Sequence, residues 1–263
     1  MNKPNISPGC RLCRSGSWLC VYITQRCNRD CYFCSQKKLK KGDAGADAIR
    51  AYVSEEIRFD DVEEVVRYLT YWKLNGLGIS GGEPLLVFDK VCRLISVAKR
   101  TIPSIYVWLY TNGDLATGKR LRKLKECGLD ELRFDLAARD YDLAPLRATA
   151  GIIDNVTVEI PALPKDKERL IGLLDELKRV GVKYLNLHEL MVTRENSRKL
   201  AKVGITGRGS LETAEEVEAA SRKGSRRKRA GLGVNVCSLR YKREEQTKRM
   251  IEHMRAVSER VKK

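Results

Sequence analysis

The stretch "WLCVYITQRCNRDCYFCS" (residues 18–35) joins two features that decide the fold. Its first seven residues (18–24) are mostly aromatic, β-branched or apolar and predict a buried strand. Cys27, Cys31 and Cys34 follow, flanked by polar residues. In parallel α/β folds the loop at the carboxyl end of a strand is where sites are built, and three thiolates there can bind one soft metal centre. Two alternatives remain open, a structural zinc site completed by a distant residue and three unrelated thiols.

The rest of the chain repeats this strand-then-helix rhythm. Amphipathic patterns over residues 60–75, 87–100, 118–127 and 166–180 predict helices. They alternate with apolar runs that predict further strands, at 76–80, 104–110, 131–137, 155–161, 183–190 and 232–238. Such alternation is typical of repeated βα units around a parallel sheet, so the sequence predicts an α/β fold.

Composition limits the class of protein. The chain has 263 residues, of which 43% are hydrophobic, enough for a folded core. Its longest apolar run, "WLCVYI", is too short to span a membrane, and no secretory h-region is present at the N-terminus. We therefore expect a cytoplasmic protein without a membrane partner. Nine cysteines in a reducing compartment indicate metal binding or chemistry more than disulfides.

Positive charge is concentrated near the C-terminus. The net charge is +17, and residues 222–263 contain fifteen Lys and Arg against four Glu. Two interpretations stay open, a solvated charged surface of the kind thermophile proteins carry and a nucleic-acid-binding patch. A last helix over roughly 242–262 keeps Met250, Ile251, Met254 and Val257 at helical spacing, which predicts that it packs on the domain.

A second motif follows the second predicted strand. In "GISGGEPLL" (78–86), Gly81, Gly82, Glu83 and Pro84 stand between a strand and a helix. Alone, such glycines serve a tight turn and Pro84 opens a helix. Together with the cysteine triplet, which has two aromatic residues before its last cysteine, the motif resembles the radical S-adenosylmethionine (SAM) enzymes.

That resemblance implies a fold and a reaction. The expected fold is α/β, a partial (β/α)6 radical SAM barrel with a short cysteine-containing N-terminal segment and a basic C-terminal extension. Cys27, Cys31 and Cys34 would ligate a 4Fe–4S cluster whose fourth iron binds the amino and carboxylate groups of SAM. An electron from a donor such as ferredoxin or flavodoxin would release a 5′-deoxyadenosyl radical, which abstracts a hydrogen atom from a substrate.

The resemblance also predicts residues that contact SAM at the ends of the strands. The expected set is Phe33, Gly81, Gly82, Glu83, Pro84, Asn112 and Asp135, and Thr111 and Glu159 are weaker candidates. Asn112 could instead begin an ordinary turn, and Asp135 could pair with neighbouring Arg133. His188 and Glu189 could face the substrate or be structural.

Over its whole length the chain resembles archaeal proteins related to pyruvate formate-lyase activating enzyme. This rests on "CRLC" (10–13), "LYTNGD" (109–114) and "VNVCSLRYKREEQTKRM" (234–250). Cys10 and Cys13 form a C-x-x-C pair expected in a loop, and Cys237 ends the last predicted strand. Because chain ends can lie close together, the three predict a second metal site, zinc or an auxiliary iron–sulfur cluster, with no fourth ligand assigned. The other cysteines, Cys20, Cys92 and Cys127, are predicted to be small core residues.

We divide the chain into an N-terminal C-x-x-C segment (1–17), a radical SAM core (18–205) and a basic extension (206–263). The expected substrate is unknown, with an RNA nucleotide and a glycyl-radical site on another protein as the two candidates. A non-enzymatic hypothesis also remains, a zinc-stabilised basic protein that binds nucleic acid. It does not account for the "GGEP" turn after the second strand.

Overall fold

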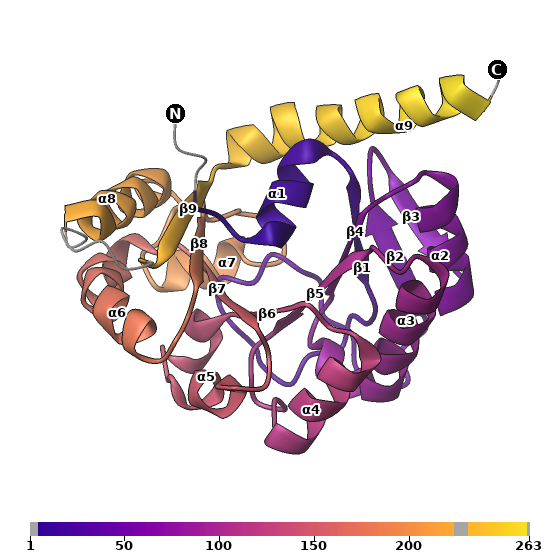
Figure 1. The fold of residues 1–263 in the computed structure, drawn as a ribbon. Coiled ribbons are helices and arrows are strands. Elements are labelled where there is room, and N and C mark those ends of the chain that lie inside the picture. The colour runs from indigo at the N-terminus through magenta and orange to yellow at the C-terminus, as the bar shows by residue number, and fades with distance from the viewer. Residues whose placement is uncertain (1–4, 224–230, 262–263) are drawn as a thin grey trace.

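The structure is a computed structural model that describes residues 5–223 and 231–261. One nine-stranded sheet runs through it, in the order β3-β2-β1-β4-β5-β6-β7-β8-β9. Neighbouring strands from β1 to β9 in this order are parallel. They are β1 (Trp18–Tyr22), β4 (Gly76–Ser80), β5 (Tyr106–Thr111), β6 (Glu131–Phe134), β7 (Asn155–Pro161), β8 (Tyr184–His188) and β9 (Gly233–Cys237). The sheet curls without closing, since β1 and β9 do not pair, so the prediction of a partial barrel is confirmed (Figure 1).

Side chains alternate between the two faces of the sheet. On β5, Val107 and Leu109 point outward into the hydrophobic core, whereas Trp108 and Tyr110 face the inside of the barrel. Outside, the core lies between the sheet and the helices α2 (Val62–Tyr71), α3 (Phe88–Thr101), α4 (Gly118–Cys127), α6 (Lys167–Arg179) and α8 (Ser210–Lys223). The apolar outer face therefore stabilises the fold and leaves the inner face available for polar groups.

Two strands at the edge of the sheet were not predicted. β2 (Ile49–Tyr52) pairs antiparallel with β1, and β3 (Glu56–Phe59) pairs antiparallel with β2. Both are four residues long and carry charged residues, so neither shows enough alternation to be distinguished from a loop. The hairpin extends the sheet beyond β1.

Short helices occur at several loops and were also not predicted. They are α5 (Ala144–Thr149), α7 (Ser197–Lys202) and the 3-10 turns η2 (Leu136–Arg139) and η3 (Pro164–Asp166). The 3-10 turn η1 (Pro84–Val87) begins at Pro84, where the sequence allowed a helix to open. The segment expected to be a polar extension contributes α8 and β9, and α8 packs against α6 and β9. The basic run at 224–230 lies outside the described residues.

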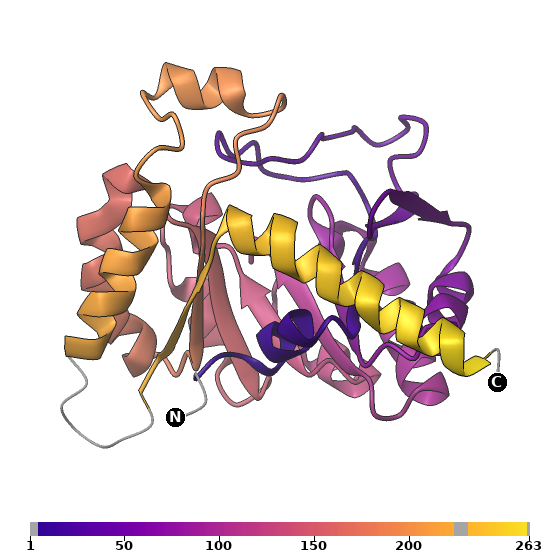
Figure 2. The same ribbon diagram turned by 90° about the horizontal axis from the view of Figure 1, so that it is seen from above.

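Helices from the two ends of the chain cover the gap between β1 and β9. α1 (Pro8–Ser15) contacts β1, β4 and β5, and α9 (Thr247–Val261), preceded by a π turn (Tyr241–Gln246), crosses diagonally in front of the opening (Figure 2). Met250 and Val257 of α9 are buried, so its predicted packing is confirmed. None of the helices in the described ranges is long and apolar enough to cross a membrane.

The prediction that Cys10 and Cys13 lie in a loop is wrong, because both belong to α1. Two start signals were present in the sequence. Ser7 accepts a hydrogen bond from the Cys10 N–H (3.1 Å), and Pro8 stands at the first helical position. With eight residues including a glycine, α1 was too short for its periodicity to be recognised.

Candidate functional site

The three clustered cysteines line one cavity with the predicted SAM contacts. Cys27, Cys31 and Cys34 lie in the loop that follows β1, where the carboxyl ends of the parallel strands meet. They border a cavity of about 220 Å³. Of the predicted SAM contacts, five also line it, namely Phe33, Gly81, Gly82, Asn112 and Asp135, as do Thr111, Glu159 and His188. The fold thus brings together residues that are more than a hundred positions apart in sequence.

The cysteine loop is tied to the loop after β5. Arg29 donates two hydrogen bonds to the Asp114 carboxylate (2.6 and 2.7 Å), and Asn28 donates a third (2.8 Å). Asn112 in turn donates to the Asn28 side chain (2.8 Å). The hydrogen bonds from Arg29 lower the pKa of Asp114, so this carboxylate is ionised. Asn112 was predicted from the sequence as a site residue, whereas Asp114, two residues later in the same motif, was not.

Gly81 and Gly82 bring the "GGEP" turn against the segment that precedes Cys27. The Gly82 N–H donates to the Thr24 carbonyl (2.8 Å), and the Glu83 N–H donates to the Arg26 carbonyl (2.7 Å). A Cβ atom on Gly82 would lie 2.0 Å from the Arg26 carbonyl oxygen, so no larger residue fits this position. Glycine is required here for contact between two backbones, whichever ligand the cavity binds.

Glu83 and Pro84 do not line the cavity. The Glu83 carboxylate is fully buried and accepts hydrogen bonds from Leu85 N–H (3.0 Å), Thr111 Oγ1 (2.9 Å) and Asn112 N–H (2.8 Å). Burial raises its pKa to about 7 despite these three donors. Pro84 is buried at the start of η1. The structure therefore gives Glu83 a positioning role, since it fixes the strand end that presents Asn112.

Asp135 faces the cavity and is not paired with Arg133, so that alternative is wrong. Its carboxylate accepts a hydrogen bond from the Ala138 N–H (3.3 Å), and burial raises its pKa to about 7. Asp135 lies just beyond the end of β6 (Glu131–Phe134), where its side chain caps the start of η2. The Arg133 side chain lies deeper in the barrel, against Glu131 and Glu159.

The cysteine side chains suit a soft metal centre. Burial raises the pKa of Cys27 and, with a contribution from Asp135, raises that of Cys31 to about 12, so both are neutral thiols without a metal. Metal binding displaces these protons. Arg29 donates its backbone N–H to Cys27 Sγ (3.4 Å), a contact that stabilises a thiolate. Three sulfur donors on one loop, with Lys38 beside them, fit an anionic iron–sulfur cluster at this cavity.

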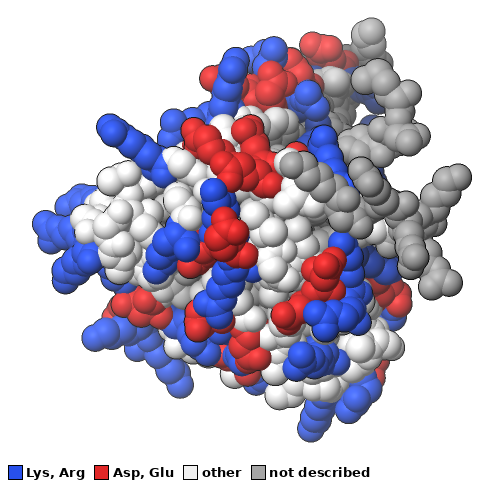
Figure 3. All heavy atoms as spheres, turned by 90° about the vertical axis from the view of Figure 1, so that its left-hand side faces the viewer, with Lys and Arg blue, Asp and Glu red and all other residues white. Residues whose placement is uncertain are grey.

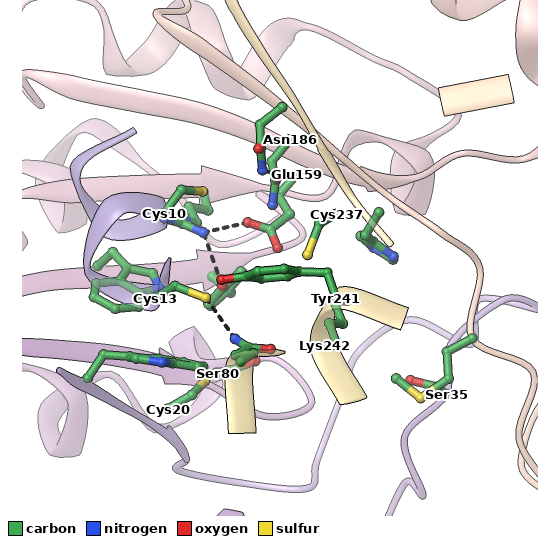
Figure 4. A pocket seen from close by; sticks show the side chains of 18 of the residues that line it. Cys10, Cys13, Cys20, Ser35, Ser80, Glu159, Asn186, Cys237, Tyr241 and Lys242 are labelled. Atoms are coloured by element: carbon green, nitrogen blue, oxygen red, sulfur yellow. Dashed lines mark hydrogen bonds and ion pairs between the residues drawn. The ribbon is translucent and has the colours of Figure 1, made fainter. Parts of the chain in front are cut away.

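A second cavity of about 340 Å³ continues into the barrel from the first. Seven residues line both cavities and form the boundary between them, namely Phe33, Ser35, Gln36, Ser80, Tyr110, Glu159 and His188. Cys10, Cys13 and Cys237 line the second cavity, as Figure 4 shows, together with Cys20. Cys20 therefore faces the interior of the barrel, whereas Cys92 and Cys127 pack against the outer core as predicted.

A buried ionic network that sequence reasoning missed supports this second cavity. Arg133 donates to Glu131 (2.7 Å) and to Glu159 (2.6 Å), and its side chain is only 3% exposed. Burial pushes the pKa of Glu159 upward, but the Arg133 charge holds it below its ordinary value. Glu159 is thus committed to an ion pair at the boundary of the two cavities. Glu131 and Arg133 are two residues apart on β6, so the sequence already indicated that their side chains lie on the same face of the sheet.

His188 and Glu189 have separate places. His188 lines both cavities, and burial together with the Lys242 charge lowers its pKa to about 4, so its imidazole is neutral at physiological pH. The Glu189 carboxylate accepts a hydrogen bond from the Leu239 N–H (2.7 Å) and joins the loop after β8 to the one after β9. Of these two residues, His188 is the one placed to meet a ligand.

Comparison with known proteins agrees with this geometry. A sequence model described as the Radical SAM superfamily matches residues 21–203, which include the cysteine triplet and the "GGEP" turn. A Methanocaldococcus jannaschii protein, provisionally named a glycyl-radical enzyme activating enzyme, is 28% identical over 223 residues, covering 81% of this chain and 58% of that protein. The GTP 3′,8-cyclase of Staphylococcus carnosus is 31% identical over 121 residues, 46% of this chain and 34% of the cyclase. The chain thus spans a little over half of the first relative and a third of the second.

Solved structures share the fold at low sequence identity. Streptococcus suis SuiB bound to S-adenosylmethionine superposes with a TM-score of 0.62 at 14% identity, over 84% of this chain and 50% of SuiB. SuiB bound to its precursor peptide SuiA superposes with a TM-score of 0.61 at 13% identity, over 84% of this chain and 48% of SuiB. Because the superfamily model covers more than half of the sequence and its motif residues gather at one cavity, this chain belongs to the radical SAM superfamily.

Proposed function

We propose that this protein binds a 4Fe–4S cluster through Cys27, Cys31 and Cys34 and cleaves SAM reductively at the adjoining cavity. When bound, the cluster and SAM supply a 5′-deoxyadenosyl radical that abstracts a hydrogen atom from the substrate. The observation that carries the proposal is the convergence of three thiols with Gly81, Gly82, Asn112 and Asp135 around one cavity at the carboxyl ends of the strands.

The residues around the cavity have distinct tasks in this proposal. The Gly82 contact with Arg26 holds the cysteine loop against the "GGEP" turn, and Glu83 keeps the end of β5 in place. Asn112 and Asp135 then offer polar groups to the amino and hydroxyl groups of SAM. Phe33 and the covering helices α1 and α9 help to exclude water, which protects a radical intermediate from side reactions.

Two substrate classes follow from different observations. Similarity to the M. jannaschii protein favours a glycyl-radical site on a partner protein, whose loop would enter at the cavity. Positive charge in residues 222–263 favours RNA. On the side of the molecule drawn in Figure 3, Lys and Arg are interspersed with Asp and Glu, so this face gives little support to RNA. We favour a protein substrate because of the similarity to the M. jannaschii protein. RNA binding that weakens steeply with added salt would reverse that choice.

The test of the proposed function is anaerobic SAM cleavage. The protein is reconstituted with iron and sulfide, mixed with SAM and dithionite, and assayed for 5′-deoxyadenosine. Dithionite replaces the physiological donor, for which ferredoxin or flavodoxin is our candidate. Cys27→Ala should reduce the product to background, whereas Cys92→Ala, in α3 on the outside of the barrel, should not change it.

The same samples distinguish the non-enzymatic hypothesis. A zinc-stabilised nucleic-acid-binding protein would take up zinc without iron or sulfide and would form no 5′-deoxyadenosine. Equal product from the wild type and Cys27→Ala would also contradict the proposed function, because the reaction would then not depend on the first cysteine set.

A further inference from the structure

The second cavity carries three cysteines that the proposed reaction does not use. Cys10 and Cys13 lie on α1 and Cys237 ends β9, and all three line the cavity of about 340 Å³ inside the barrel (Figure 4). Cys10 and Cys13 are three residues apart in a helix, so they lie on the same face of α1. Residues separated by more than two hundred positions thus present sulfur to one enclosed space.

The position of α1 is fixed by contacts at both of its ends. Near its start, Ser7 accepts a hydrogen bond from Arg133 (3.0 Å), and the Gly9 N–H donates to Glu131 (3.2 Å). At its end, Gly16 adopts the left-handed conformation (φ 78°) and packs on the backbone of α9, where a Cβ atom would lie 2.4 Å from the Arg249 carbonyl oxygen. These contacts hold the Cys10 and Cys13 face against the interior before any ligand binds.

Hydrogen-bond donors inside the same cavity lack acceptors. Within the described part of the chain, Trp18 Nε1, Trp108 Nε1 and the Tyr241 hydroxyl are buried without a hydrogen-bond partner, and all three residues line the cavity. Trp108 is only 1% exposed. Buried donors in native proteins are nearly always satisfied, so these three indicate an occupant rich in acceptors. The sulfur atoms of an iron–sulfur cluster accept such hydrogen bonds.

Positive side chains also border the cavity. Arg14, Arg133 and Lys242 line it, and Arg14 donates to the Asn235 side chain (2.6 Å). A cluster held by three thiolates carries net negative charge, which is costly to bury without cations nearby. The two arginines and the lysine meet that requirement, although Arg133 shares its charge with two glutamates.

A cluster fits the three sulfurs better than a single ion does. Among residues 5–223 and 231–261, no three His, Cys, Asp or Glu side chains are grouped closely enough to ligate one metal ion. Zinc would require its ligands to converge on one point at about 2.0–2.3 Å. In a 4Fe–4S cluster each cysteine binds a different iron, so the sulfurs stand apart around a larger body. We infer that Cys10, Cys13 and Cys237 hold a second iron–sulfur cluster inside the barrel.

Metal content in the absence of the first cysteine set tests this inference. A chain in which Cys27, Cys31 and Cys34 are all alanine is reconstituted anaerobically with iron and sulfide and then desalted. It should retain about four iron and four sulfide per chain and give an EPR signal on reduction. Adding Cys10→Ala and Cys13→Ala should remove both the metal and the signal. Adding Cys92→Ala and Cys127→Ala, the matched control on outer helices, should leave them in place.

Two results would overturn the inference. One is a triple-alanine chain that is folded by circular dichroism yet binds no iron or sulfide, and the other is binding of zinc alone. If the triple-alanine chain does not fold, the double variant C10A/C13A of the otherwise unchanged protein provides the test. Its iron content after reconstitution should be about four atoms per chain, compared with about eight in the wild type. Unchanged iron there would also overturn the inference. The result is independent of the proposed function, which is judged by 5′-deoxyadenosine formation in Cys27→Ala.

Discussion

The two cysteine sets of this protein are assembled in opposite ways. Cys27, Cys31 and Cys34 come from one loop, which a buried carboxylate and a glycine contact hold in place. Cys10 and Cys13 approach Cys237 because α1 docks on the Glu131–Arg133–Glu159 network at one end and on α9 at the other. The first set depends on local backbone geometry, and the second depends on buried charge and on contacts between the chain ends. Perturbing either support should therefore affect one set more than the other.

The largest effect on stability is expected from Arg133→Met. This change leaves Glu131 and Glu159 buried without a cation, and breaking such a network costs about 3–5 kcal/mol. Chemical denaturation of the metal-free protein measures the loss. Arg93→Met is the matched control, since Arg93 is 66% exposed in its pair with Glu63, and surface pairs contribute about 1 kcal/mol or less. If both variants lose the same free energy, the buried network is not what docks α1.

A smaller effect, confined to the first set, is expected from Gly82→Ala. The added methyl group collides with the Arg26 carbonyl, so the turn or the cysteine loop must shift, at a cost of about 1–3 kcal/mol. Iron bound through Cys27, Cys31 and Cys34 should fall in a chain that lacks Cys10 and Cys13. Gly172→Ala in α6 is the control, because the added methyl group there has no atom within 4 Å. This change should stabilise the protein by about 0.5–1 kcal/mol. Full iron loading in Gly82→Ala would show that the turn adapts.

A further effect is a pH dependence that distinguishes Glu83 and Asp135 from Glu159. Burial raises the pKa of Glu83 from 4.5 to about 7, so between these values the folded state keeps a proton that the unfolded state has lost. The contribution of Glu83 to the free energy of unfolding of the metal-free protein should therefore fall as pH rises through this window, by up to about 1.4 kcal/mol per pH unit, and level off above it.

Glu83→Gln removes one of the two groups with this behaviour. Asp135, whose pKa is also raised to about 7, remains, whereas His188, whose pKa is lowered to about 4, contributes with the opposite sign below pH 6.5. The slope in Glu83→Gln should therefore become less negative by up to about 1.4 kcal/mol per pH unit. Glu159→Gln is the contrasting variant, because Arg133 holds the pKa of Glu159 below its ordinary value and this carboxyl does not titrate in that window. Denaturation curves at several pH values measure the slopes. An unchanged slope in Glu83→Gln would mean that Glu83 stays ionised.

The parallel strands and the main helices could be predicted from the sequence because their signals are local. β4 and α4 have the predicted bounds, since an apolar run or a helical period is contained within each segment. The first cysteine set was predictable for the same reason. α1 and the β2–β3 hairpin were missed because their segments are too short for a period to be recognised.

The supports of the two sites could not be predicted because they are tertiary. Nothing near Glu83 in the sequence indicates that its carboxylate turns toward β5, and Arg133 gives no local sign that it will hold Ser7. Buried polar residues are chosen by partners that lie far away in the chain. Sequence motifs therefore identified which residues belong to the sites more successfully than what each residue does there.

The docking of α1 against β9 and α9 also sets an order of events during synthesis. A ribosome adds about 5–20 residues per second, so the thiols from Cys27 to Cys34 emerge within about two seconds of one another. Cys10 must wait roughly ten to fifty seconds for Cys237 at the same rate. Until the last strand has been made, α1 has no completed barrel to enter, and its two thiols remain available to other reactants. Cys27, Cys31 and Cys34 can therefore come together early on a nascent chain, whereas Cys10 and Cys13 can meet Cys237 only after the last strand has been made.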